Sequence, residues 1–191
     1  MIHIYSDKRP AREKTRKDHF LLMQPTPSLV ARVADVDWTK NKPLRAGVIV
    51  YTVHKNKLLF CMAVDRKTSE ITDFGGGVSY KKDKTTAAGA LREFTEESLG
   101  VFGKFYPSSL DNCVVVYNNN MAIFFLPLNC NPEEVTQTFT VRYRKEKVNE
   151  VSSLAWMSKK GFLHHLQSDK VFYVRVSKLL QPVIGEVLDM L

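Results

Sequence analysis

The sequence holds few cysteines, and they form no pattern typical of a stabilising framework. Cys61, Cys113 and Cys130 lie far apart and are odd in number. They match neither a disulfide framework nor the ligand spacing of a zinc site. We therefore expect reduced thiols and a protein of a reducing compartment, either cytoplasmic or nuclear.

Long apolar runs are also lacking. The most apolar short stretch, MAIFFLPL at residues 121–128, is far too short to cross a bilayer as a helix. The first twenty residues are charged almost from the start and contain no apolar segment of the secretory type. These absences predict a soluble protein that is neither secreted nor embedded in a membrane.

Positive charge, in contrast, is abundant. Lys and Arg number 28 against 20 Asp and Glu, which gives a net charge of +8 and a pI near 9.4. Residues 1–45 hold ten of the basic residues and five of the acidic ones, and a second basic group is VRYRKEK at 141–147. Such a surface favours polyanionic partners such as nucleotides, RNA or inositol phosphates.

Length and patterning indicate one domain with an extension. The 191 residues are 44% hydrophobic, enough for a core without disulfide or metal staples. The apolar pattern begins near residue 45, so we assign residues 1–44 to a basic N-terminal extension and residues 45–191 to the folded domain.

Strand and helix patterns alternate along this domain, which predicts a mixed α/β sandwich. Period-two or continuous apolar runs predict extended segments at 46–53, 57–64, 70–78, 112–118, 120–128 and 150–158. Helical spacing predicts helices at 85–100, at 159–167 and at 172–191, the last interrupted near Pro182. The segment 132–147 fits a helix and a strand equally well.

The predicted helix at 85–100 gathers carboxylates in an otherwise basic chain. Glu93, Glu96 and Glu97 lie three and four residues apart, hence on one flank. Two carboxylates about 5 Å apart repel by roughly 3 kcal/mol at an effective dielectric near 20. Arg92 relieves part of this repulsion. A sequence of this kind more often forms an acidic helix face that is simply exposed to solvent.

The surroundings of the glutamates favour a metal site instead. The other side of the helix is small and apolar, so the acidic side is held on a fixed element. The preceding glycines, Gly75–Gly77, allow a phosphate or a metal to approach the backbone. Several carboxylates on one turn suit Mg²⁺ or Mn²⁺, which accept carboxylate, water and phosphate oxygens together.

These residues resemble the Nudix box, in the stretch GGGVSYKKDKTTAAGALREFTEESLGV at 75–101. The core of that pattern, Arg-Glu-apolar-x-Glu-Glu, is matched without change by REFTEE at 92–97. Gly77, the pair Ala87–Ala88 and the pair Gly100–Val101 lie in the expected neighbourhood. Compact basic proteins of this kind also resemble members carried by large DNA viruses.

Two positions depart from the family pattern. The upstream glutamate of the box falls on Lys84, and a loop one residue longer would place Asp83 there, where it could accept from Arg92. Gly100 comes one residue late, so Leu99 resembles an insertion at the helix end. Neither departure removes one of the predicted metal ligands.

The resemblance implies a Nudix-like α/β/α sandwich with a mixed sheet, and hydrolysis of a pyrophosphate bond in a nucleoside diphosphate linked to another group. By this resemblance Glu93, Glu96 and Glu97 hold Mg²⁺ or Mn²⁺, and the carbonyl of Gly76 or Gly77 completes the coordination shell.

Further roles follow from the same resemblance. Arg92 orients the glutamates, and Glu93 or Glu96 assists proton removal as a catalytic group. The general base of this family sometimes comes from a later loop, where Glu146 or Glu150 could serve, although both are more often ordinary surface charges.

Substrate contacts are expected beside the glycines, from Gly76 and from the lysines of the following loop, Lys81, Lys82 and Lys84. The substrate stays open between capped RNA, a dinucleoside polyphosphate, a nucleotide and a diphosphoinositol polyphosphate. RNA would contact the basic N-terminal segment and the segment from Arg142 to Lys147. The alternatives are a catalytically weak Nudix-fold module that binds RNA or polyphosphate, and an interaction scaffold with a fortuitous acidic helix.

Overall fold

The computed structural model describes residues 26–146, 149–168 and 171–191. The first 25 residues of the predicted extension and Lys147, one of the predicted RNA contacts, lie outside the described residues. Within the described part of the chain, no helix is both long and apolar enough to cross a membrane. All three cysteines fall in this part and are free, as the sequence predicts.

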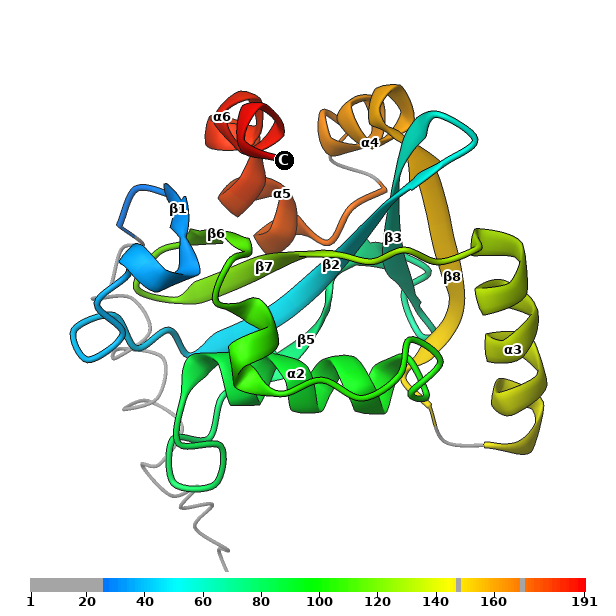
Figure 1. The fold of residues 1–191 in the computed structure, drawn as a ribbon, viewed down its shortest axis with the longest axis horizontal. Coiled ribbons are helices and arrows are strands. Elements are labelled where there is room, and N and C mark those ends of the chain that lie inside the picture. The colour runs from blue at the N-terminus through cyan, green and yellow to red at the C-terminus, as the bar shows by residue number, and fades with distance from the viewer. Residues whose placement is uncertain (1–25, 147–148, 169–170) are drawn as a thin grey trace, which may run out of the picture.

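A mixed sheet of eight strands forms the centre of the molecule (Figure 1). The strands are β1 (Leu29–Arg32), β2 (Arg45–His54), β3 (Lys57–Asp65), β4 (Ile71–Thr72), β5 (Phe74–Gly77), β6 (Val114–Tyr117), β7 (Met121–Pro127) and β8 (Val151–Ser158). The main order is β1-β6-β7-β2-β3-β4, while β5 pairs with β2 and β8 pairs with β3. Strands β2 and β7 are parallel, and the other named pairs are antiparallel.

The predicted extended segments at 46–53 and 57–64 form an antiparallel hairpin, β2 and β3. Its turn residues Lys55 and Asn56 both have positive φ, 49° and 58°, the backbone that matches a two-residue turn to the strand twist. Side chains then alternate between the faces of the sheet, so that Val48 and Val50 enter one core and Ile49 enters the other.

Helices cover both faces of the sheet, which confirms the predicted α/β/α class. Helices α2 and α3 contribute to the core on one face, and α4, α5 and α6 to the core on the other (Figure 1). Their bounds are α2 (Thr86–Glu97), α3 (Pro132–Lys145), α4 (Lys159–Leu166), α5 (Val174–Leu180) and α6 (Ile184–Met190). A 3-10 turn containing Pro182 separates α5 from α6, as expected.

The ambiguous segment at 132–147 forms helix α3. Asn131 caps its start by accepting from the Glu133 N–H (3.0 Å), and Pro132 occupies the first turn, where its missing N–H has no consequence. These end signals decide between the two interpretations that apolar spacing leaves open.

The sheet begins before residue 45. Strand β1 pairs with β6, and Val33 and Val36 are buried in the core beside α2. Residues 29–36, assigned to the extension by the sequence, therefore add an edge strand and two core side chains to the sheet.

Candidate functional site

Helix α2 presents the acidic residues from a fixed position. Its start is capped by Thr85, whose hydroxyl accepts from the Ala88 N–H (3.1 Å). Ala90, Leu91 and Phe94 are buried against the sheet, which leaves the opposite flank to the charged residues.

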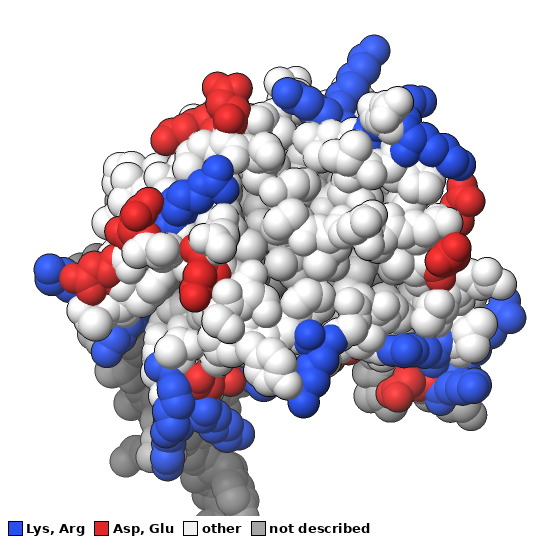
Figure 2. Space-filling model, viewed as in Figure 1, with Lys and Arg blue, Asp and Glu red and all other residues white. Residues whose placement is uncertain are grey.

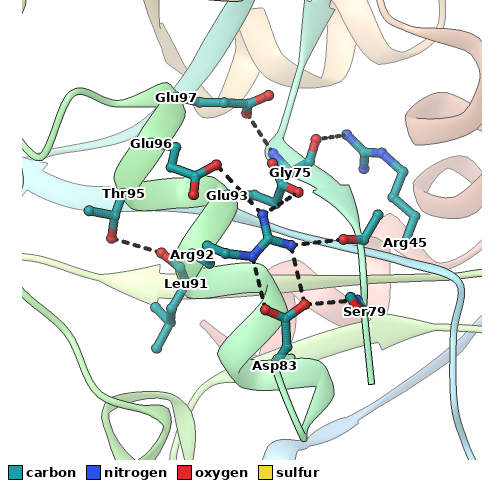
Figure 3. Close-up of polar contacts among 11 residues, drawn as sticks. Arg45, Gly75, Ser79, Asp83, Leu91, Arg92, Glu93, Thr95, Glu96 and Glu97 are labelled. Atoms are coloured by element: carbon teal, nitrogen blue, oxygen red, sulfur yellow. Dashed lines mark hydrogen bonds and ion pairs between the residues drawn. The ribbon is translucent and has the colours of Figure 1, made fainter. Parts of the chain in front are cut away.

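Arg92 is the centre of the polar network on this flank (Figure 3). Its Nη1 lies 2.7 Å from Oε1 of Glu93 and 3.6 Å from Oε2 of Glu96. Its Nη2 donates to the Gly77 carbonyl (2.9 Å). Hydrogen bonds to Asp83 first, and then to Glu93, raise the pKa of Arg92. Arg92 thus contacts both Glu93 and Glu96.

Asp83, nine residues before Arg92, lies against the guanidinium of Arg92. Its carboxylate, only 4% exposed, accepts from Nε of Arg92 at 2.9 Å and from Nη2 at 3.2 Å. The N–H of Ser79 donates to it as well (2.8 Å). These hydrogen bonds, the one from Arg92 above all, lower the pKa of Asp83 below its ordinary value. Asp83 therefore accepts from Arg92, as the sequence analysis allowed.

Glu93 lies directly over the backbone of Gly76. A Cβ atom at residue 76 would stand 2.5 Å from Cδ of Glu93 and 2.6 Å from its Oε1. The second glycine of the row is therefore needed for space, because any side chain would displace the carboxylate.

Glu97 is the most deeply placed of the three glutamates. Its Oε2 accepts from the Gly75 N–H at 2.7 Å (Figure 3). Burial, followed by the negative charge of Asp73, raises the pKa of Glu97 to about 8, against the opposing effects of the Gly75 N–H and Arg45. Glu96, in contrast, is 62% exposed.

A buried ion pair contacts β5, the strand that contains the three glycines. Nη1 of Arg45 lies 2.7 Å from Oδ2 of Asp73, whose side chain is fully buried, and Nη2 donates to the Gly75 carbonyl (2.8 Å). Both backbone groups of Gly75 are therefore engaged, one by Arg45 and one by Glu97. Sequence reasoning missed this pair, although an aspartate directly before an apolar residue and three glycines is a usable signal for a buried charge.

The backbone at the end of α2 brings Leu99 against α3. Leu99 and Gly100 both adopt left-handed backbone, with φ of 55° and 64°. The Gly100 N–H donates to the Thr95 carbonyl (2.9 Å) and so closes the helix. The carbonyl of Leu99 accepts from Nη1 of Arg142 on α3 (2.6 Å). Leu99 thus links the end of α2 to the end of α3.

A cleft of about 600 Å³ opens along this end of α2. We call it the acidic cleft; its lining residues are Glu93, Thr95, Glu96, Glu97, Leu99, Gly100, Glu146, Asn149 and Glu150. The two positions that the resemblance offers for a general base, Glu146 and Glu150, thus lie in the same cleft as the three glutamates of the helix. A second cavity of about 190 Å³ shares Asn149 and Glu150 with it.

Asn149 holds the two sides of the acidic cleft together. Its Nδ2 donates to the carbonyl of Glu97 (3.0 Å) and to that of Val151 (3.1 Å). The segment before β8 is thereby fixed against the last turn of α2. No sequence motif marks this asparagine, because its partners are backbone atoms 52 residues and two residues away.

The lysines of the loop before α2 lie apart from this lining. Lys81, Lys82 and Lys84 are exposed, and none of them lines the acidic cleft. Lys84 has φ of 68°, and its Nζ donates to the carbonyl of Lys81 (2.9 Å). On the face shown in Figure 2, basic side chains gather over this loop at the lower left and over the C-terminal part of α3 at the lower right.

The donor chemistry of the acidic cleft fits Mg²⁺ or Mn²⁺, because the five glutamates of its lining offer hard carboxylate oxygens. In the described ranges, however, no three Asp, Glu, His or Cys side chains form a ready-made metal cluster. The outward carbonyls of Gly75 and Gly77 are already hydrogen-bonded by Arg45 and Arg92. The carboxylates are therefore the donors that a metal ion would use first.

Comparison with known proteins gives distant structural likenesses. No protein-family model and no curated protein matches the chain. A C. elegans Ap4A hydrolase aligns at 16% identity over 75% of this chain and 96% of its own, with a TM-score of 0.43. The NUDIX domain of Shewanella oneidensis NrtR, complexed with ADP ribose, aligns at 12% identity over 79% and 95%, with a TM-score of 0.42.

A MutT/nudix family protein from Enterococcus faecalis is similar at 11% identity, over 95% of this chain and 74% of that one, with a TM-score of 0.41. At these TM-scores and identities, the likeness decides neither the family nor the activity of this chain.

Proposed function

We propose that the chain is a metal-dependent Nudix pyrophosphohydrolase that cleaves a pyrophosphate bond in a nucleoside-diphosphate-linked substrate. The observation that carries this proposal is the acidic cleft, in which Arg92 and the Gly75–Gly76 backbone hold glutamates of α2 in fixed positions. In a chain of net charge +8, such a gathering of carboxylates on fixed supports indicates a place for cations.

We assign different roles in hydrolysis to the residues of the acidic cleft. Glu93, Glu96 and Glu97 are the ligands for Mg²⁺ or Mn²⁺, which when bound neutralises phosphate charge and lowers the pKa of a water molecule. Arg92 orients Glu93 and Glu96. Glu146 or Glu150, on the opposite side of the cleft, accepts the proton of the attacking water.

The substrate class follows from the charge of the surface. Basic side chains of the loop before α2 and of the end of α3 favour a highly charged anion: capped RNA, a dinucleoside polyphosphate, a nucleotide or a diphosphoinositol polyphosphate. Gly76 together with Lys81, Lys82 and Lys84 would contact its phosphates, and free cysteines suit a cytoplasmic or nuclear site of action.

A substrate panel tests the reaction class. Capped RNA, dinucleoside polyphosphates, ADP-ribose, nucleoside triphosphates and diphosphoinositol phosphates are incubated with the protein and Mn²⁺, and the products are identified by mass spectrometry. We expect release of a product cut at a phosphoanhydride, and no product in EDTA. Binding of one of these compounds without any turnover would instead indicate a non-catalytic module.

Two glutamine variants test the assigned site. Glu96→Gln and Glu97→Gln should each abolish the metal-dependent release of product and the rise in melting temperature that Mn²⁺ produces. Folding should stay near normal, because a glutamine at 97 can still accept the Gly75 N–H. Glu133→Gln, on the exposed first turn of α3, is the matched control and should behave as the wild type. Full activity in both site variants would refute the site.

A further inference from the structure

The acidic cleft poses an electrostatic problem for the substrates proposed above. All its charged lining residues are glutamates: three from α2, one from the end of α3 and one from directly before β8. A bound metal ion compensates the phosphates at the scissile bond. Any further phosphate of the substrate would face carboxylates unless a cation of the protein lies at the rim.

Arg142 is a cation in direct contact with that rim. Its Nη1 donates to the carbonyl of Leu99 (2.6 Å) and stands 3.5 Å from the place of a Cβ at Gly100, and both of these residues line the cleft. One turn later, the N–H of Glu146 donates to the Arg142 carbonyl (3.1 Å), and Glu146 also lines the cleft. The last turn of α3 therefore turns the side with Arg142 and Glu146 towards the acidic cleft.

The backbone of Leu99 is strained in a way that serves this contact. A leucine at φ of 55° is unfavourable by roughly 1–2 kcal/mol, and such outliers persist only where the surroundings hold them. Here the left-handed backbone directs the Leu99 carbonyl to Arg142.

The contact with Leu99 occupies one nitrogen of the guanidinium only. Among the described residues Arg142 takes part in no ion pair, and its side chain is exposed. A guanidinium held at one nitrogen keeps its other N–H groups in a fixed fork, the geometry that binds a phosphate through two parallel hydrogen bonds.

We propose that Arg142, anchored on the Leu99 carbonyl, binds a phosphate group of the substrate that is not part of the scissile bond. The preferred substrate is then a chain of three or more linked phosphates, such as a dinucleoside polyphosphate or a triphosphate-capped end, rather than a diphosphate ester. This inference rests on the proposed hydrolase activity for its substrate, and it adds Arg142 as the residue that selects for phosphate number.

Kinetics on a substrate series test the inference. Dinucleoside tetraphosphate and ADP-ribose are each assayed with the wild type, Arg142→Gln, Arg142→Lys and the control Lys178→Gln. Lys178 is an exposed cation on α5, which covers the other face of the sheet. For Arg142→Gln we expect KM for the tetraphosphate to rise about tenfold or more, as for loss of a charged hydrogen bond, with kcat little changed. KM for ADP-ribose should change by less than about twofold, because it lacks the additional phosphates.

Arg142→Lys distinguishes phosphate recognition from a purely structural contact between α2 and α3. Arg142→Lys keeps the charge but loses the fork, so we expect it to recover only part of the affinity for the tetraphosphate. Lys178→Gln should match the wild type on both substrates. An equal loss on ADP-ribose and tetraphosphate, or no loss on either, would overturn the inference, since a tie between α2 and α3 alone cannot distinguish phosphate number.

A binding measurement without turnover tests the role of Arg142 independently of the proposed hydrolase activity. A triphosphate analogue with methylene groups in place of both bridging oxygens is titrated calorimetrically into each folded variant in the presence of Mg²⁺. We expect about tenfold weaker binding by Arg142→Gln and unchanged binding by Lys178→Gln. If the protein hydrolyses none of the substrates but shows this binding result, the phosphate-binding role of Arg142 is supported and the hydrolase activity is refuted. If the protein is active but Arg142→Gln binds the analogue as the wild type does, only the role of Arg142 is refuted.

Discussion

Gly76 shows how a single residue without a side chain determines the placement of a functional group. Replacement by alanine would bring a Cβ to within 2.5–2.7 Å of the carboxylate atoms of Glu93. Because misplacement by about 1 Å can lower a rate roughly a hundredfold, we expect Gly76→Ala to reduce kcat/KM by about tenfold or more. Overpacking should also lower the free energy of unfolding by about 1–3 kcal/mol.

The neighbouring glycine is a matched control for this substitution. A Cβ at Gly77 meets no heavy atom within 4 Å, and its φ is not positive. Gly77→Ala should therefore keep both the activity and the melting temperature of the wild type, measured under the same conditions. Equal loss in both variants would mean that flexibility of the glycine row, and not space for Glu93, is what matters.

The residues of the site differ in how far sequence could predict them. REFTEE at 92–97 and the role of Asp83 are local in sequence, and the structure brings Arg92, Asp83 and Glu93 into contact as expected. Arg45, Asp73 and Asn149 were missed because their partners are far away in sequence or are backbone atoms. The lysines of the preceding loop were placed beside the glycines by sequence proximity alone, and they do not line the cleft.

At the scale of elements, Asp83 fastens the loop before α2 to the helix itself. Its carboxylate accepts hydrogen bonds from two nitrogens of Arg92 and from the N–H of Ser79. In Asp83→Asn, an amide group faces these donors, so we expect the free energy of unfolding at pH 7 to fall by about 1–3 kcal/mol. Urea unfolding from pH 3 to pH 7 measures the difference between wild type and variant.

The pH dependence of this difference has a defined sign. Arg92 and the Ser79 N–H lower the folded-state pKa of Asp83 below its ordinary value of 3.8. A group of this kind stabilises the fold above its unfolded-state pKa and loses that contribution as the pH falls through the folded-state pKa. The difference should thus be constant above about pH 5 and shrink below about pH 4. Asp111→Asn, an exposed carboxylate, should change little at any pH, and a difference that grows in acid would contradict the assignment.

The elements themselves were largely predictable, and the exceptions have physical reasons. Long periodic segments such as 46–53, 57–64 and 85–100 appear as β2, β3 and α2 with ends shifted by at most three residues. In α3, alternating threonines and apolar residues imitate a strand, and only the Asn131–Pro132 start decides the matter. Strand β1 has four residues and no periodicity to detect, so it was assigned to the extension.

At the scale of the whole molecule, the acidic cleft arises from tertiary packing. The end of α2 and the segment before β8 are about fifty residues apart in sequence, and Asn149 and Arg142 bring them together. The sheet supplies the frame for this contact, because β8 pairs along β3 and so returns the chain to the end of α2. Local patterns indicate the acidic helix, but they cannot indicate which later segment closes the cleft.

The same frame bears on where the folded domain begins. Leu29–Arg32 pair with β6, and the Val33 N–H donates to the Cys113 carbonyl (3.0 Å). The centroid of the Trp38 ring lies 5.7 Å from that of the Phe124 ring. Nη2 of Arg32 also donates to the carbonyl of Met190 (2.8 Å), at the end of α6. A boundary at residue 45, as the apolar pattern suggests, would remove all of these contacts and expose β6 as an edge.

We therefore expect a chain that starts at Arg45 to be less stable than one that starts at Thr26, by more than about 3 kcal/mol. Two buried valines alone contribute about that much, at roughly 1.5 kcal/mol or more for each side chain removed from the core. The chain from Thr26 retains β1 and the mutual hydrogen bonds of Thr26 and Asn119. Urea unfolding of both chains measures the difference, and equal midpoints and slopes would place the start of the domain at residue 45 after all. Because β6 would become an exposed edge strand, the shorter chain should also aggregate at concentrations at which the longer one stays monodisperse.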